Sequence, residues 1–515
     1  MTESSLPAGK VWLVGAGPGE PGLITVRGVE LLREADVVLF DALSHPALLS
    51  HCSPHAELRN VGKRGGKYSP TQKWITEQLI ELSNAGKRVV RLKGGDSFLF
   101  ARGAEEAEDL VAAGVPFEVV PGLSSPVATS AYAGIPLTHR DLSSSVTFIT
   151  GSDKAGSEWS SEAWEKLATA TDTLCILMGM RRIARIMRAL QDGGRSVETP
   201  VAVVQWGARP EQQVVTGTLS TIADAVRERG VSNPAVIIVG EVVSLRETLS
   251  WFEKKPLFGQ RILVPRPPHQ AASTAKLIRE RGAEPVLVPV IEIFPPSDPQ
   301  PLRAAIADLA SYQWVLFTSA NGVDRFFSAL FDANLDARAL GSAKLGVIGP
   351  KTAAALVPYG VRADLVAKEF VGEGLAKAVL ESTVGSAPRV LIPRAEVARE
   401  QLPESLRANG LKVNVVPAYK TVGISGAEAE ALASMLRNGQ VDIATFTSSS
   451  TVTSTVQALG VDAKEILGQV TVASIGPITT KTALDLGITV HISAEQFTVP
   501  GLLDAIQRYR LNAPD

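Results

Sequence analysis

The chain has 515 residues, of which 51 are basic, 53 are acidic and 45% are hydrophobic. This composition is typical of a soluble globular protein of three or four domains, and it argues against a disordered chain or one dedicated to nucleic acid. No apolar run approaches the about 18 residues of a membrane span, the first residues lack the pattern of a signal peptide, and Cys52 and Cys175 are too few for a disulfide framework. We therefore expect a cytoplasmic protein that binds neither membranes nor nucleic acid.

Short apolar strands alternate with helical segments through the first half of the chain, which predicts an α/β fold. A polar stretch near residue 155 separates two α/β pieces, and Pro256 follows a charged run that indicates a linker. The strands are expected at Val11–Val14, Val37–Phe40, Arg88–Leu92, Phe117–Val120, Val146–Ile149, Thr173–Leu177 and Ala235–Val239.

A glycine-rich turn follows the first strand and carries Gly15, Gly17 and Gly19. Glycines in this place, with Asp41 at the end of the next strand, are found in dinucleotide-binding folds. The spacing differs from the G-x-G-x-x-G pattern, however, and Pro18 does not suit a pyrophosphate cradle. A nicotinamide cofactor is therefore disfavoured, and a tight turn without a ligand stays an alternative for this motif taken alone.

Four further turns rich in glycine or proline leave strands in the same half, at residues 61–66, 90–96, 120–125 and 133–138. With the first turn, they have the order and spacing of uroporphyrinogen-III C-methyltransferases of the tetrapyrrole methylase family, which residues 10–251 resemble. The resemblance implies a cofactor cleft between two α/β domains, and transfer of methyl groups from S-adenosylmethionine to macrocycle carbons with S-adenosylhomocysteine as product. The residues that it places at the cofactor are Pro18, Gly94, Gly95, Asp96, Leu99, Ser124, Ser125, Met178, Ala202 and Gly207.

Two residues match family positions proposed for proton transfer, Asp41 as the acceptor and Lys63 as the donor. C-methylation of a pyrrole leaves a cation that needs proton transfer afterwards, so an acid/base pair near the substrate suits the chemistry. Each residue has a simpler alternative, namely an acidic residue at a strand end and a solvated lysine.

The macrocycle that the family methylates carries eight carboxylates, so cationic side chains are expected around it. A further set, Arg181, Arg185 and Arg188, recurs at helical spacing and could add a cationic stripe, although a solvated helix face explains it as well. The remaining candidates are Lys63, Arg64, Lys67, Arg102, His139 and Arg140.

Two positions depart from the family pattern. Ser97 stands where the family has proline and Ala101 where it has glycine, and alanine disfavours a positive φ. These changes predict slower or altered methyl transfer. His51, Cys52 and His55 form a short cluster without an evident fourth ligand, so no metal site is expected.

The second half contains an internal repeat with a nearly constant interval. A period this long predicts a duplicated domain of two α/β lobes, and such lobes commonly enclose a small-molecule site. The repeated motifs are Val264-Pro265-Arg266 with Ile392-Pro393-Arg394, Phe317-Thr318-Ser319 with Phe446-Thr447-Ser448, and Ile348-Gly349-Pro350 with Ile475-Gly476-Pro477.

These motifs, together with residues 417–421, make residues 260–508 similar to uroporphyrinogen-III synthases. That family closes linear hydroxymethylbilane into a ring with inversion of the last pyrrole and loss of water, and it needs no cofactor. Tyr419 is the candidate to assist departure of the hydroxyl, with packing between the lobes as its alternative. Hydroxyls at turns suit a site that holds a flexible polyanion in one shape, and the candidates are Thr318, Ser319, Thr352, Ser448 and Thr479.

Together the resemblances predict a two-domain tetrapyrrole methylase fold over residues 1–252 (subdomains 10–152 and 153–252), a linker at 253–260, and a duplicated two-lobed α/β synthase fold over 261–515. Lobe one would combine 261–294 with 422–515, and lobe two would be 295–421. The chain would be a bifunctional enzyme that makes uroporphyrinogen III and methylates it at carbons 2 and 7 to precorrin-2, towards sirohaem and cobalamin. Alternatively, only one half is catalytic and the other is a ligand-binding or regulatory module. Methylases of this family are commonly dimers, which implies a homodimer through the first half.

Overall fold

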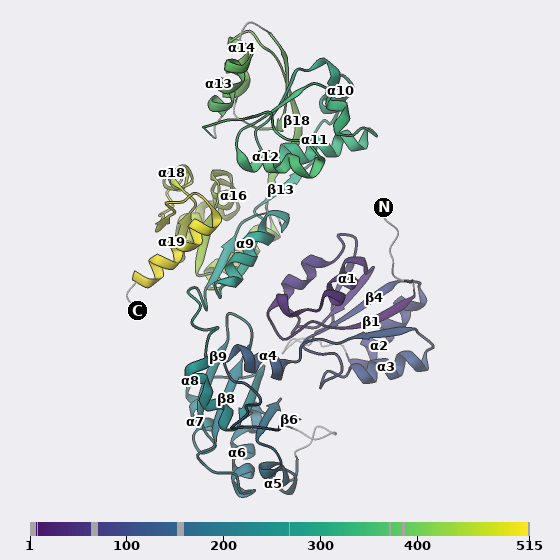
Figure 1. Ribbon diagram of the computed structural model, residues 1–515, viewed down its shortest axis with the longest axis vertical. Helices are drawn as coiled ribbons and strands as arrows, with labels where there is room; N and C mark the ends of the chain where they lie inside the picture. The colour runs from purple at the N-terminus through teal and green to yellow at the C-terminus, as the bar shows by residue number, and fades with distance from the viewer. Residues whose placement is uncertain are drawn as a thin grey trace. The chain divides into compact units, whose positions relative to one another are not determined.

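The computed structural model describes residues 7, 9–62, 71–151, 159–266, 268–369, 372–383, 387–398 and 400–512. Its contacts divide the chain into two compact units, one of Met1–Ile262 with Ser273–Pro285 and the other of Leu263–Ala272 with Val286–Asp515. Both units are α/β, with helices flanking the sheets (Figure 1). Within the described ranges, no helix is long and apolar enough to cross a membrane.

The first sheet is parallel throughout and has the strand order β3-β2-β4-β1-β5. Its central strands are buried on both faces, as is usual for a parallel sheet that helices cover on both sides. β4 nevertheless places two charged residues, Arg91 and Lys93, in this interior. The strands are β1 (Lys10–Gly15), β2 (Val37–Phe40), β3 (Glu57–Asn60), β4 (Arg88–Lys93) and β5 (Phe117–Val120).

Helices pack on the two faces of this sheet (Figure 1). Leu31 of α1 belongs to the core on one face, while Leu79 of α2 and Leu110 of α3 belong to the core on the other. The hydroxyls of Thr25 and Thr71 cap α1 and α2 by accepting hydrogen bonds from backbone amides of the first turn. These helices are α1 (Val26–Glu34), α2 (Gln72–Asn84) and α3 (Gly103–Ala112), whereas the next helix, α4 (Ser125–Tyr132), contacts β10 (Ala235–Val239) of the second sheet.

The second sheet has the order β6-β7-β10-β8-β9, with β6 and β7 parallel and the other neighbours antiparallel. Its strands are β6 (Val146–Thr150), β7 (Thr173–Leu177), β8 (Pro200–Gln205), β9 (Gln213–Thr218) and β10 (Ala235–Val239). Its helices are α5 (Ser161–Ala170), α6 (Ile183–Asp192), α7 (Ile222–Glu228) and α8 (Arg246–Leu249). The strands expected from the sequence in this half are all confirmed, most of them to the residue.

The last two sheets repeat one arrangement. The third has the order β12-β11-β19-β20-β21, and the fourth has β18-β17-β14-β15-β16 with β13 added beside β18. The third sheet thus takes two strands from before the fourth sheet in the sequence and three from after it. β13 leads into the fourth sheet and β18 leads out of it, and these two strands pair antiparallel. The expected duplication is therefore present in the fold.

The strands of the third sheet are β11 (Arg261–Val264), β12 (Glu284–Leu287), β19 (Ile443–Phe446), β20 (Thr471–Ser474) and β21 (Ile492–Ser493). Those of the fourth are β13 (Ile291–Phe294), β14 (Trp314–Phe317), β15 (Lys344–Val347), β16 (Leu365–Val366), β17 (Arg389–Ala395) and β18 (Lys412–Gly423). The helices in this part of the chain are α9 (Pro268–Glu280), α10 (Gln300–Ala307), α11 (Ala320–Asp332), α12 (Pro350–Leu356), α13 (Gly372–Ser382), α14 (Gln401–Ala408), α15 (Ala427–Arg437), α16 (Ser449–Leu459), α17 (Ala463–Leu467), α18 (Pro477–Asp485) and α19 (Val499–Asn512).

Candidate functional site

The glycine-rich turns of the first unit pack directly on one another. A Cβ added to Gly15 would lie 2.5 Å from the Cα of Gly122, and one added to Gly122 would lie 2.3 Å from the carbonyl oxygen of Gly95. Only residues without a side chain allow these backbones to come so close. The glycines are followed by a three-residue 3₁₀ helix at Pro21–Leu23, and α1 begins only at Val26, so they do not lead into the N-terminus of an α-helix as a dinucleotide site requires.

Asp96 fastens two of these turns together. Its Oδ1 accepts a hydrogen bond from the amide of Phe98 at 2.8 Å, and its Oδ2 accepts one from the amide of Gly122 at 2.9 Å. Asp96, which the resemblance places at the cofactor, therefore holds two of the turns that line the cavity in a fixed shape.

The turns and the second sheet enclose a cavity of about 320 Å³. All the residues predicted at the cofactor line it, except Ala202. Ala202 is completely buried in the core of the second sheet, while Val204, two residues further along β8, reaches the cavity. The cavity is lined by Pro18, Leu43, Gly94, Gly95, Asp96, Leu99, Phe100, Ala101, Ser124, Ser125, Thr129, Leu177, Met178, Val204, Trp206, Gly207, Arg209, Asn233, Pro234, Ala235 and Val236.

Unusual backbone conformations gather around this cavity. Phe100, Met178 and Trp206 line it with φ values of 54°, 55° and 50°. Arg102 and Ala208, close to them in the chain, have φ values of 61° and 62°. Non-glycine residues rarely adopt positive φ, and such strain concentrates at functional sites.

The structure does not require a positive φ at Ala101. Ala101 is not among the residues with positive φ, whereas its two neighbours in the chain, Phe100 and Arg102, are. The alanine is therefore tolerated, because the left-handed conformations fall on either side of it.

Sequence reasoning missed Arg209, a cation at the cavity. Its Nη2 donates a hydrogen bond to the carbonyl of Leu43 at 2.8 Å, and its guanidinium lies 5.0 Å from the ring centre of Trp206. Burial lowers the pKa of Arg209. The sequence signal that could have found Arg209 was its position two residues after Gly207, which was already a candidate at the cofactor.

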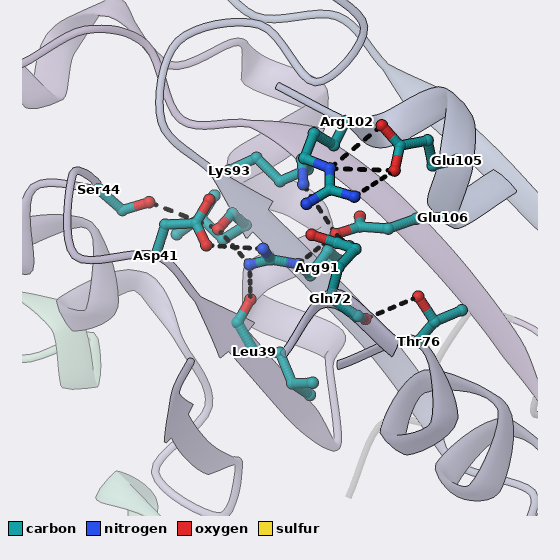
Figure 2. Close-up of polar contacts among 11 residues, drawn as sticks. Leu39, Asp41, Ser44, Gln72, Thr76, Arg91, Lys93, Arg102, Glu105 and Glu106 are labelled. Atoms are coloured by element: carbon teal, nitrogen blue, oxygen red, sulfur yellow. Dashed lines mark hydrogen bonds and ion pairs between the residues drawn. The ribbon is translucent and has the colours of Figure 1, made fainter. Parts of the chain in front are cut away.

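Asp41 stands at the end of β2, and its Oδ1 accepts a hydrogen bond from Nη2 of Arg91 at 2.6 Å (Figure 2). Its side chain is 28% exposed, whereas that of Arg91 is 2% exposed. The partner proposed for it, Lys63, lies outside the described residues. Arg64 and Lys67 lie outside them too.

The other cationic candidates of the first unit do not line the cavity. Arg102 is exposed and pairs with Glu105, and Arg140 is exposed in the loop before β6. His139 is half-buried, and its Nδ1 accepts a hydrogen bond from the amide of Asp141. Arg181 and Arg185 belong to a separate hollow of about 460 Å³ beside α6 and α7.

The cluster near Cys52 shows no sign of a metal site. Burial raises the pKa of the Cys52 thiol to about 11, which disfavours the thiolate that would bind a metal, and burial also lowers the pKa of His51. Over the described ranges, the structure has no group of three His, Cys, Asp or Glu side chains that could hold a metal ion.

The repeated Phe-Thr-Ser motifs of the second unit have the same structure. Ser319 caps α11 by accepting a hydrogen bond from the amide of Gly322, and Ser448 caps α16 by accepting one from the amide of Thr451. Both motifs follow a parallel strand, where α/β proteins commonly bind ligands. The serines predicted at the substrate are therefore at helix N-termini, which favour anionic groups.

Three of the other residues predicted in this unit, Thr352, Thr479 and Tyr419, are buried. Thr352 and Thr479 are 4% and 5% exposed. Thr318 is half-buried. Tyr419 is 7% exposed, and its hydroxyl lies 3.0 Å from Oγ of Ser319. The structure thus brings Tyr419 and Ser319 together, a contact that the sequence alone could not show.

Comparison with known families matches residues 10–223 to the tetrapyrrole (corrin/porphyrin) methylases and residues 272–504 to uroporphyrinogen-III synthase HemD. The porphyrin biosynthesis protein HemD of Ruminiclostridium josui is 39% identical over 499 residues, which cover 97% of both chains. The uroporphyrinogen-III C-methyltransferase of Bacillus subtilis is 40% identical over 338 residues, 65% of this chain and 69% of that protein. Among solved structures, the uroporphyrin-III C-methyl transferase of Thermus thermophilus, complexed with S-adenosyl homocysteine, is 37% identical with a TM-score of 0.40, and covers 46% of this chain and 99% of its own.

The first half is thus a tetrapyrrole methylase and the second half a uroporphyrinogen-III synthase by family. The chain belongs to the same family as the R. josui protein. In this chain the residues that match the methylases precede those that match the synthases.

Proposed function

We propose that the second unit cyclises hydroxymethylbilane to uroporphyrinogen III, and that the first unit methylates this macrocycle at carbons 2 and 7 with S-adenosylmethionine to give precorrin-2, towards sirohaem and cobalamin. The observation that carries the proposal is the cavity in the first unit, because nine separate positions expected at the cofactor come together there from distant parts of the chain.

The volume and the lining of the cavity suit S-adenosylmethionine. Its volume of about 320 Å³ lies in the range of small-molecule sites. Bare backbone shapes it, since a Cβ on Gly94 would lie 2.9 Å from Cβ of Leu43 and one on Gly207 would lie 2.3 Å from Oγ1 of Thr129. Met178, whose side chain lines the cavity and is 55% exposed, offers an apolar, polarisable surface to an adenine ring.

When bound, S-adenosylmethionine supplies an electrophilic methyl group. Bond formation to a macrocycle carbon leaves a positive charge on the macrocycle, which loses a proton to restore neutrality. Asp41 is our candidate for accepting that proton, because its carboxylate is partly exposed and is paired with Arg91. We keep Lys63 as the candidate donor.

In the second unit, the reaction requires the loss of the hydroxyl of hydroxymethylbilane and closure of the ring. The substrate is flexible and polyanionic, so most of the work lies in holding it in one shape. The N-termini of α11 and α16, with Ser319 and Ser448, provide backbone amides for its carboxylates.

Two assays on the full-length chain test the two halves separately. The first supplies uroporphyrinogen III and S-adenosylmethionine without oxygen, and we expect a product heavier by two methyl groups. The second supplies hydroxymethylbilane alone, and we expect isomer III to form faster than spontaneous closure gives the symmetric isomer I. Failure of one assay with a folded chain would leave that half as a ligand-binding module.

A further inference from the structure

Beneath Asp41, the interior of the first sheet holds a buried cluster of charges (Figure 2). Arg91 and Lys93 on β4 are each 2% exposed, and Glu106 on α3 is completely buried. Taking charges out of water is costly unless they are paired and hydrogen-bonded, so a buried set of this kind requires a reason.

Glu106 is the centre of the cluster. Its Oε1 accepts hydrogen bonds from Nζ of Lys93 at 2.8 Å, from Nε2 of Gln72 at 2.8 Å and from Nε of Arg91 at 3.3 Å. The three donors come from β4 and α2, while Glu106 stands in the first turn of α3, where the helix dipole favours a negative charge. Its Oε2 is buried and has no hydrogen-bond partner within the described part of the chain.

Arg91 connects this centre to Asp41. Its Nε faces Glu106, its Nη1 donates to the carbonyls of Leu39 and Leu92 at 3.4 Å and 3.3 Å, and its Nη2 donates to Asp41 at 2.6 Å. The guanidinium is planar and rigid, so the contacts of Nε and Nη1 fix the direction in which Nη2 points. The Asp41 carboxylate is therefore held by a side chain that cannot turn.

We propose that Glu106 is a positioning residue for the proton transfer at Asp41: it fixes the Arg91 side chain, which in turn orients the Asp41 carboxylate towards the substrate. This inference rests on the proposed function of the first unit.

The arrangement differs from an ion pair that only stabilises the fold. The buried cluster ends at the carboxylate of Asp41, which is 28% exposed. Asp41 lies two residues before Leu43, which lines the cavity. Lys93 contributes to the same support, since its Nζ donates to Oε1 of Glu106 at 2.8 Å. Burial and the nearby Arg91 lower the pKa of Lys93, while Glu106 and Asp41 act in the opposite direction.

A double-mutant cycle on the full-length chain tests the inference. The variants are Asp41→Asn, Glu106→Gln and the combination of both, each assayed for methyl transfer to uroporphyrinogen III. We expect Asp41→Asn to lower kcat by about 100-fold, the scale of a lost general base. We expect Glu106→Gln to lower kcat by about tenfold in the natural chain. In the Asp41→Asn variant, Glu106→Gln should lower kcat no further, because Glu106 acts through the Asp41 carboxylate.

Two readouts keep a structural effect apart from positioning. The Kd for S-adenosylhomocysteine should change less than about twofold in every variant, and KM for the macrocycle should change less than kcat. Glu108→Gln is the matched control, because Glu108 is an exposed glutamate on the same helix, and its kcat should equal that of the natural chain.

Equal fold losses from Glu106→Gln in both backgrounds would overturn the inference, as would a loss that appears only in the Kd for S-adenosylhomocysteine. If Glu106→Gln does not fold, Arg91→Lys replaces it in the same cycle, since it keeps the charge but cannot contact Asp41 and Glu106 together. A natural chain that transfers no methyl group would overturn the proposed function itself, and this inference with it.

Discussion

The hydroxyl of Tyr419 on β18 lies 3.0 Å from Oγ of Ser319, the residue that caps α11. This hydrogen bond joins the interior of β18 to the N-terminus of α11, and Tyr419 packs in the core of the same lobe. Burial raises the pKa of Tyr419, with the bond to Ser319 acting in the opposite direction, so the phenol stays neutral near pH 7. Its position favours packing and orientation of Ser319 over direct chemistry.

Tyr419→Phe should therefore cost about 1 kcal/mol of unfolding free energy, the scale of one lost hydrogen bond. The rate of hydroxymethylbilane cyclisation should stay within about threefold, because the ring still fills its place. Tyr312→Phe is a matched control, since Tyr312 is also buried and accepts one side-chain hydrogen bond, from Asn414. A rate loss confined to Tyr419→Phe, without loss of stability, would instead give Tyr419 a part in the reaction.

Ser97, at the position where the resemblance to the methylases implies a proline, is completely buried. Its hydroxyl has no hydrogen-bond partner among the described residues, which is an unfavourable state for a polar group. Ser97→Ala should raise the unfolding free energy of the first unit by about 1 kcal/mol. Thermal unfolding checks this, with Ser130→Ala as the contrast: Ser130 is equally buried but donates to the carbonyl of Val127, so its loss should lower stability.

Arg209 joins two walls of the cavity through its contacts with Leu43 and Trp206. Arg209→Met keeps most of the length of the side chain but removes the bond and the charge. We expect the Kd for S-adenosylhomocysteine, measured by calorimetry, to rise about tenfold, equivalent to about 1.4 kcal/mol. Arg229→Met, at an exposed position, should leave that Kd unchanged. Equal affinities for all three proteins would show that Arg209 does not shape the site.

Asp36 should make stability depend on pH. Its side chain accepts hydrogen bonds from the side chain and the amide of Arg88, and these lower the pKa of Asp36 below its ordinary value of 3.8. A carboxyl whose pKa is lower in the folded state stabilises the fold above the unfolded pKa, and this contribution is lost as pH falls through the folded pKa.

Asp36→Asn should therefore lower the unfolding free energy by about 1 kcal/mol at pH 7, a modest value because the pair is partly exposed to water. The difference from the natural chain should stay constant down to about pH 5 and shrink below about pH 3.8. Urea unfolding at several pH values measures it, and Asp109→Asn, at an exposed site on α3, should show no such trend. A difference that is independent of pH would contradict the assignment.

The sequence predicted most of what depends on local pattern. The strand at Val37–Phe40 was placed to the residue, because short β-branched runs between helical segments are a strong signal. The internal repeat predicted the duplicated lobes, which appear as the same strand order in the third and fourth sheets. Gly94 and Met178, far apart in the chain, were both expected at one cofactor and line one cavity.

The parts that escaped prediction depend on tertiary contacts. Glu106 reads as one more acid on a charged helix, and only the fold brings it against Arg91 and Lys93. Arg209 carries no pattern that separates it from a surface arginine. The sequence could not show that the left-handed conformations of this loop fall on Phe100 and Arg102, on either side of Ala101.

The central claim is that one chain makes uroporphyrinogen III and then methylates it. The most direct measurement supplies the full-length protein with hydroxymethylbilane and S-adenosylmethionine without oxygen, and follows the products by mass and by isomer analysis. We predict a type III macrocycle with two added methyl groups and two molecules of S-adenosylhomocysteine for each. Unmethylated macrocycle, or methylated product only when uroporphyrinogen III is added from outside, would contradict the claim.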